Sequence, residues 1–86
     1  MKIIFHKNFE KKYQNMRANT KKRVKERLGL FLRDEFDPVL NNHPLRGKYQ
    51  GYRSINTTGD LRAVYGRVSE GRRIFVVLDT HNKLYR

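Results

Sequence analysis

The side chains of this 86-residue chain best suited to chemistry are two of its three histidines. His43 stands before Pro44 in a turn-rich segment, and His81 follows the last apolar run of the sequence. An imidazole titrates near pH 6.5, so two of them can supply a general base and a general acid. His6 follows a short strand-like segment, where we expect it to cap a helix or to face solvent.

Three charged side chains near predicted strand ends are expected to lie at the same rim as these two histidines. They are Arg53, Asp60 and Arg62. An arginine there can stabilise the developing charge on a phosphate, and the set as a whole fits metal-free cleavage of RNA. The sequence has no nucleophilic Ser or Cys constellation, no phosphate-binding glycine loop and no metal-ligand spacing. Asp60 also has an equally good structural interpretation, because Asp beside Gly59 is common in turns and Arg62 could simply pair with it.

One strand and two helices are predicted before residue 41. The segment Lys2–Phe5 is β-prone, and Asn8 is the expected N-cap of a first helix. A second helix is expected to be capped by Asn19 or Thr20 and to run to about Glu35, because Asp37-Pro38 cannot continue it. The apolar stripes of the two helices are Phe9, Tyr13 and Met16, and Val24, Leu28 and Phe31.

The second half of the chain predicts strands. Residues 41–51 are rich in turn formers, and three β-type runs follow at hairpin spacing. These runs are Tyr52–Asn56, Leu61–Val68 and Ile74–Asp79. We expect a single α+β domain over residues 1–86, with the N-terminal strand and a helical hairpin packed on an antiparallel sheet of about four strands. The other face of the sheet would then be available for a ligand.

The charge distribution indicates a polyanionic or acidic partner. The chain carries 20 Lys and Arg against 8 Asp and Glu, which gives a net charge of +12. Residues 1–33 alone hold 11 basic and 2 acidic side chains. Phosphates release counterions when such a surface binds them, which favours nucleic acid, although a solvated helix face would carry the same charges. The expected contacts with phosphate are Lys21, Lys22, Arg23 and Lys25.

Composition excludes several other classes of protein. The absence of cysteine excludes disulfides and thiolate metal sites. Ile, Leu, Val and Phe together number 23 of 86 residues, above the roughly 20% below which highly charged chains stay disordered. The longest apolar run, Ile74 to Leu78, is too short to cross a membrane, and the N-terminus has no signal-peptide apolar region. We therefore expect a cytoplasmic protein without a membrane partner.

Four short motifs, in this order and spacing, resemble the RelE/ParE toxin superfamily and, within it, the YafQ-like mRNA interferases. They are His43-Pro44-Leu45-Arg46-Gly47, Gly51-Tyr52-Arg53, Asp60-Leu61-Arg62-Ala63-Val64-Tyr65 and Thr80-His81-Asn82-Lys83-Leu84-Tyr85. The resemblance covers nearly the whole chain and implies a RelE-like, microbial-ribonuclease-like fold. It implies a bacterial type II toxin that cuts mRNA, usually in the A site of the 70S ribosome, without a cofactor. It also implies an acidic or partly disordered antitoxin, through which the complex binds operator DNA.

The resemblance assigns roles residue by residue. His43, Asp60 and His81 match catalytic positions of the family, Arg62 matches an arginine of a related strand, and Tyr85 matches an aromatic suited to base stacking. The implied reaction is attack of the ribose 2′-hydroxyl on the adjacent phosphate, giving a 2′,3′-cyclic phosphate and a free 5′-hydroxyl. In this reaction His81 is the general acid, and His43 or Asp60 is the general base. Arg62 is the electrostatic clamp on the phosphate.

Two further positions are expected to contact substrate, and one of them departs from the family pattern. Arg53 is expected at the rim with the other charged groups. Asn56 stands where the YafQ-like pattern has a histidine, and an amide can form hydrogen bonds but cannot titrate.

Two other functions are compatible with the sequence. A non-catalytic ParE-like toxin would inhibit DNA gyrase by binding it, but such toxins lack the catalytic histidines, so His43 and His81 favour the nuclease. A small structural ribosome-binding protein would explain the charge, but not the histidines, aspartate and arginine near strand ends.

Overall fold

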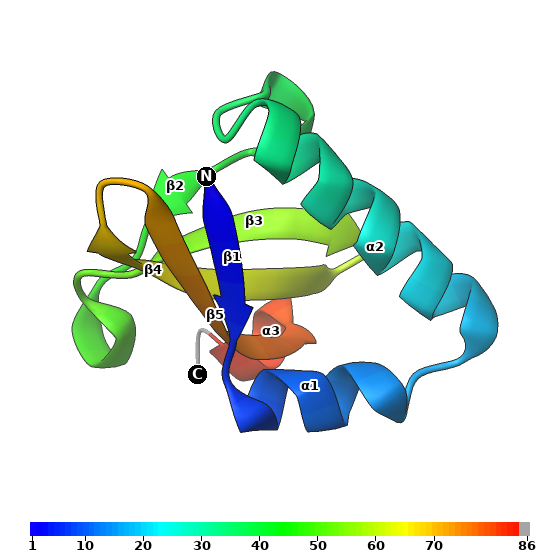
Figure 1. Ribbon diagram of the computed structural model, residues 1–86. Coiled ribbons are helices and arrows are strands. Elements are labelled where there is room, and N and C mark those ends of the chain that lie inside the picture. Colours follow the sequence, from blue (N-terminus) through cyan, green and yellow to red (C-terminus); the bar gives the residue numbers. More distant parts are fainter. Residues whose placement is uncertain (85–86) are drawn as a thin grey trace.

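The computed structural model describes residues 1–84, which form two long helices on one face of a five-stranded sheet (Figure 1). The helices are α1 (Lys7–Gln14), α2 (Ala18–Arg33) and the short α3 (His81–Leu84). The strands are β1 (Lys2–Phe5), β2 (His43–Pro44), β3 (Arg53–Thr58), β4 (Leu61–Ser69) and β5 (Arg72–Thr80). Two 3₁₀ turns, η1 (Pro38–Leu40) and η2 (Gly47–Tyr49), flank β2. Across the described residues, no helix is long and apolar enough to cross a membrane.

The predicted α+β class is confirmed, but the sheet differs from the expected one in two ways. Its order is β1-β5-β4-β3-β2, so it has five strands rather than about four. It is also mixed, because β1 runs parallel to β5, with Ile4 opposite Ile74. The β3-β4-β5 meander leaves one edge of β5 unpaired, and β1 pairs with that edge. The extra strand β2 has only two residues, too few to show an alternating pattern.

The helix starts also differ from the prediction. His6, rather than Asn8, is the N-cap of α1, and its Nδ1 accepts a hydrogen bond from the Asn8 N–H at 3.1 Å. The second helix begins at Ala18 after Arg17, which makes no side-chain cap hydrogen bond, so the expected cap at Asn19 or Thr20 is wrong. The two helices diverge from the loop that joins them (Figure 1). Helix α1 packs against β5 and α2 packs against β3, so the two do not run side by side as the expected helical hairpin would.

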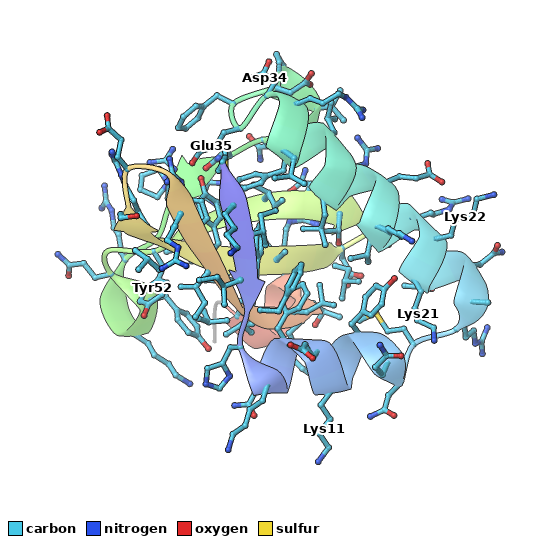
Figure 2. All side chains as sticks on the ribbon, viewed as in Figure 1. Lys11, Lys21, Lys22, Asp34, Glu35 and Tyr52 are labelled. Carbon is cyan, nitrogen blue, oxygen red and sulfur yellow. The ribbon has the colours of Figure 1, made fainter. Side chains whose placement is uncertain are left out.

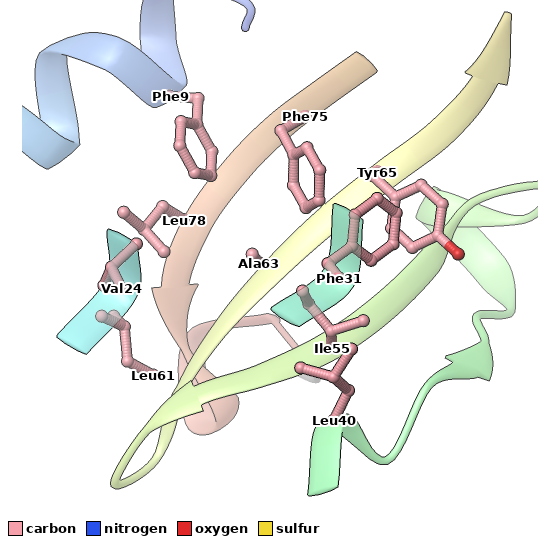
Figure 3. Close-up of a cluster of buried hydrophobic side chains, with 10 residues drawn as sticks. All are labelled: Phe9, Val24, Phe31, Leu40, Ile55, Leu61, Ala63, Tyr65, Phe75 and Leu78. Carbon is pink, nitrogen blue, oxygen red and sulfur yellow. The ribbon is translucent and has the colours of Figure 1, made fainter. Parts of the chain in front are cut away.

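Aromatic rings from the helices and the central strands form the core on the helix side of the sheet (Figure 3). Phe31 of α2 contacts Tyr65 of β4 edge-on, with ring centroids 4.8 Å apart, and Phe75 of β5 at 5.1 Å. Phe9 of α1 contacts the same Phe75 at 5.7 Å. Each fully buried side chain of this size contributes about 1.5–3 kcal/mol. This packing holds one face of the sheet against the helices and directs every second strand residue to the other face.

Candidate functional site

The face of the sheet away from the helices carries a row of three polar side chains. Ile55 and Ala63 belong to the core, so their strand neighbours point to the opposite face. Asn56 of β3 lies directly opposite Arg62 of β4, which in turn lies opposite Asp79 of β5. Directly opposed residues share a face of an antiparallel sheet. The register therefore brings together Asn56 and Arg62, both predicted for the site, and adds Asp79.

His43 lies in the next row. It is paired with Ser54 of β3 and half-buried. Its Nδ1 lies 2.8 Å from the carbonyl oxygen of Asn41. A carbonyl can only accept, so Nδ1 is the donor, and the neutral ring then carries its lone pair on Nε2. Nε2 is thus the atom that can take a proton.

Two buried polar atoms lie between these groups. Ser54 is fully buried, and neither its Oγ nor the Oδ1 of Asn56 has a hydrogen-bond partner among the described residues. Leaving a buried polar group unsatisfied costs about 1–3 kcal/mol. Ser54 was not among the predicted site residues, although its position two residues before Asn56 on the same strand would have placed it on this face.

Asp60 and His81 meet at the end of the same strands. The His81 N–H donates to the Asp60 carbonyl oxygen at 2.8 Å, which joins the β3–β4 turn to the start of α3. Both residues are exposed. The predicted carboxylate and the predicted general acid are therefore neighbours through the main chain.

The Arg62 guanidinium lies over the turn that carries Asp60. Its Nη1 donates to the carbonyl oxygens of Gly59, at 3.0 Å, and Leu61, at 3.2 Å. Gly59 has a φ of +54°, a conformation in which glycine is not strained. Within residues 1–84 no ion pair joins Arg62 to Asp60, so the simple pairing considered from the sequence is not observed.

Asp79 is a carboxylate of this face that was not among the predicted site residues. One of its oxygens accepts the Thr80 N–H at 2.8 Å and lies 3.9 Å from the Nζ of Lys12 on α1. The available signal was strand alternation, because Leu78 is buried in the core and Asp79 must therefore point the other way.

Arg53 is not brought together with the other predicted site residues. It lies opposite Tyr65, on the helix side of the sheet, where its Nε donates to Asn42 Oδ1 at 2.7 Å. Its guanidinium stacks over Phe36, 5.3 Å from the ring centroid. Tyr65 in turn donates to Glu35 at 2.6 Å.

Electrostatic shifts are found in this helix-side cluster. Burial, followed by the hydrogen bond to Glu35, raises the pKa of Tyr65 to about 12. Burial also tends to raise the pKa of Glu35, but hydrogen bonds from Arg73 and Tyr65 and the charges of Arg73 and Arg53 outweigh it, and the pKa is lowered.

The four basic residues predicted to contact phosphate divide between two sides of α2. Lys22 and Arg23 line a groove of about 850 Å³ between α2 and the β3–β4 turn, together with Arg27 and Arg33. Lys25 lines a different, largely apolar groove. Lys21 lies on the side toward α1, where its carbonyl accepts the Tyr13 hydroxyl at 3.3 Å, whereas Lys22 points outward (Figure 2). The predicted stacking residue, Tyr85, lies outside the described residues.

Comparison with solved structures identifies the fold. A YoeB/ParE toxin from Agrobacterium tumefaciens is 24% identical, with a TM-score of 0.77 over 94% of this chain and 99% of that one. YafQ from E. coli strain BL21(DE3) is 20% identical, with a TM-score of 0.72 over 99% and 98%. A copper-bound mutant toxin from Helicobacter pylori is 25% identical, with a TM-score of 0.70 over 99% of both chains.

No family model matches the chain, and neither does any curated protein sequence. The structural matches nevertheless confirm the resemblance at the level of fold: the chain has the fold of the RelE/ParE toxin superfamily, including its YafQ-like members.

Proposed function

We propose that this chain, with its RelE/ParE toxin fold, is the toxin of a type II toxin–antitoxin system and an endoribonuclease that cleaves mRNA on the ribosome. The observation that carries the proposal is the strand register. It places His43, Asn56 and Arg62 on one face of the sheet, and the Asp60–His81 main-chain bond adds two further groups at the end of the same strands. A base, an acid and a cation beside a phosphate are what RNA cleavage by protein groups alone requires.

In the proposed reaction, the 2′-hydroxyl of the ribose attacks the adjacent phosphorus while its proton passes to Nε2 of His43 or to the Asp60 carboxylate. The bond from phosphorus to the 5′-oxygen breaks, and His81 donates a proton to that leaving oxygen. The products are a 2′,3′-cyclic phosphate and a 5′-hydroxyl. Arg62 stabilises the charge on the pentacoordinate intermediate, and Asn56 contributes a neutral hydrogen bond where the YafQ-like pattern would place a titrating group.

The basic groove beside α2 supports RNA as the substrate. Its walls include Lys22, Arg23, Arg27 and Arg33, and its far side is formed by residues 57–59. These residues end in the turn that carries Asp60, so a strand lying in the groove would lead to the proposed site. Asn19 and Glu26 also line the groove.

A cognate antitoxin is the proposed protein partner. The solved structures similar to this chain include an E. coli DinJ–YafQ toxin–antitoxin complex and a YoeB–YefM complex from Staphylococcus aureus. For this chain, a net charge of +12 favours an acidic antitoxin, and we propose that the complex binds operator DNA through it. The apolar groove lined by Phe5, Leu28 and Leu32, with Lys25 at its side, suits an amphipathic acidic segment.

The proposal is tested with purified protein and programmed 70S ribosomes carrying an mRNA, with the cut mapped by primer extension. We expect cleavage that leaves a 5′-hydroxyl on the downstream fragment. An mRNA with 2′-deoxyribose at the cut position is the matched control, since it lacks the nucleophile and should stay intact. Cleavage of that control would contradict the mechanism. A lack of RNA cleavage combined with inhibition of gyrase supercoiling would instead support the ParE-like alternative.

A further inference from the structure

Five polar side chains form a connected network on the helix side of the sheet. Arg73 of β5 forms an ion pair with Glu35 at 3.1 Å, and Glu35 accepts the Tyr65 hydroxyl at 2.6 Å. The Tyr65 oxygen accepts from Asn42 Nδ2 at 2.8 Å, and Asn42 Oδ1 accepts from Arg53 Nε at 2.7 Å. The network therefore connects three strands to the segment between α2 and β2.

Asn42 is the residue that the network holds most completely. Its Nδ2 also donates to the main-chain carbonyl of Glu35 at 3.0 Å, so both ends of the amide are engaged. A second Arg53 nitrogen, Nη2, lies 3.5 Å from the Asn42 carbonyl oxygen. Arg53 itself is held by Phe36, over whose ring it stacks. The side chain and the main chain of Asn42 are thus both tied to the helix side.

The position of Asn42 determines how His43 is presented. Asn42 immediately precedes His43, the first residue of β2. The Asn42 side chain bonds to Tyr65 on the helix side, whereas His43 is paired with Ser54 and shares its opposite face. Asn41, on the other side of Asn42, has a φ of +46°, uncommon for a residue other than glycine, and its carbonyl accepts the His43 Nδ1–H at 2.8 Å. The bonds to Asn42 hold the residue that lies between Asn41, whose carbonyl selects the His43 tautomer, and His43 itself.

We propose that Asn42 and Arg53 are positioning residues for His43: they act through the 41–43 main chain to keep its ring in the Nδ1–H tautomer, with Nε2 toward the site. The inference gives Arg53 a role different from substrate contact. This inference rests on the proposed function only for the catalytic use of His43, because the tautomer of the ring exists with or without RNA.

The test is the imidazole ¹⁵N spectrum of the full chain, in which the Nδ1–H and Nε2–H tautomers of neutral histidine have distinct shifts. Asn42→Ala and Arg53→Gln should move the His43 signals toward a mixture of tautomers. The His6 signals should not move, since His6 caps α1 and lies outside the network. Arg53→Lys retains one donor for Asn42 and should restore part of the native His43 shift.

Arg73→Gln is the matched control for stability. It removes the buried ion pair at the far end of the network but leaves the Arg53–Asn42 bond in place. A positioning role predicts that this variant unfolds at lower temperature with native His43 shifts. The inference is overturned if Asn42→Ala leaves the His43 shifts unchanged, or if Arg73→Gln changes them as much as Asn42→Ala does.

A kinetic readout applies where RNA cleavage is observed. A misplaced His43 should lower kcat by up to about 100-fold with KM nearly unchanged, because the substrate contacts remain. A raised KM at constant kcat for Arg53→Gln would instead show that Arg53 binds substrate and would overturn the inference. If no RNA is cleaved, the proposed function fails, while the tautomer measurement still decides this one.

Discussion

The two faces of the sheet differ in how their polar groups are satisfied. On the helix side, the network from Arg73 to Arg53 pairs each of its members, and the rings of Phe31 and Phe75 pack against its central member, Tyr65. On the opposite side, Ser54 Oγ and Asn56 Oδ1 have no partner among residues 1–84. Complete pairing stabilises a fold, whereas the residues that we propose for chemistry, His43 and Arg62 among them, lie on that opposite face. The helix side therefore accounts for stability, and the opposite side is the better place for chemistry.

The largest effect should come from removing the histidines of the site. His43→Ala and His81→Ala should each slow cleavage by roughly 10²–10⁴-fold, because a general acid or base is lost. Because His81 is exposed, His81→Ala should change the free energy of unfolding by no more than about 0.5 kcal/mol. Single-turnover cleavage and thermal unfolding of each variant measure the two effects.

His6→Ala is the matched control for those variants. It removes the same type of ring from the α1 N-cap and should lower stability by about 0.5–2 kcal/mol without changing the rate. A rate loss as large as that of His81→Ala would mean that histidine removal acts through folding, and the division between the two faces would fail.

The opposite pattern is expected for the core. Phe31 is fully buried against Tyr65 and Phe75, so Phe31→Ala should lower the free energy of unfolding by about 3–5 kcal/mol. Phe36 is 60% exposed, and Phe36→Ala should lower it by about 1 kcal/mol or less. Denaturant unfolding measures both. At low temperature, the folded fraction of Phe31→Ala should cleave RNA at the native rate.

Acid should weaken the helix-side network before it affects the core. The pKa of Glu35 is lowered in the folded state, so its contribution is present above the unfolded-state value of about 4.5 and is lost as pH falls through the folded-state value. Glu35→Gln should be less stable than the native chain at pH 7 by about 1–3 kcal/mol, and this difference should shrink below pH 4.5. Urea unfolding at pH 7, 4.5 and 3 tests this, and a difference that grows toward low pH would contradict it.

The division of basic residues around α2 can be tested by salt dependence. Lys22→Gln with Arg23→Gln should reduce the slope of log affinity for RNA against log salt by up to about 0.7 per lost phosphate contact on a single strand. The pair Lys21→Gln with Lys25→Gln removes the same charge from the other side of the helix and should change the slope less. Equal changes would mean that the groove beside the β3–β4 turn is not the path of the RNA.

Most strands could be predicted from the sequence, and the reason lies in their local patterns. Alternation between turn formers placed β3, β4 and β5 within about two residues of their observed bounds. The parallel pairing of β1 with β5 could not be predicted in this way, because it joins residues about 70 positions apart. Nor could β2, since two residues show no period.

The candidate site was predictable from residue types near predicted strand ends, which singled out His43, Asp60, Arg62 and His81, and the family resemblance added their roles. The structure joins Asp60 to His81 through the main chain and puts Arg62 over the Asp60 turn, with His43 in the next row of the same face, while their catalytic roles stay predictions. Arg53 was grouped with them because it lies near a predicted strand end, yet strand alternation puts it with Ile55 on the helix side. The 3.6-residue period of a helix likewise separates Arg23 from Lys25, which are two positions apart, and a charge count alone ignores it.

Asn56 gives the smallest and most discriminating effect, because stability and activity should respond in different ways. Its Oδ1 is buried without a partner, so Asn56→Ala relieves that cost and should leave stability unchanged or raised. The same change removes one neutral hydrogen bond to substrate, typically about 0.5–1.5 kcal/mol, and should slow cleavage by roughly two- to tenfold.

Asn56→His adds a group titrating near pH 6.5 beside Arg62 and should shift the pH dependence of cleavage. Single-turnover cleavage between pH 5 and 9 tests both variants. A loss for Asn56→Ala as large as that for His81→Ala, or a profile unmoved by Asn56→His, would remove Asn56 from the site.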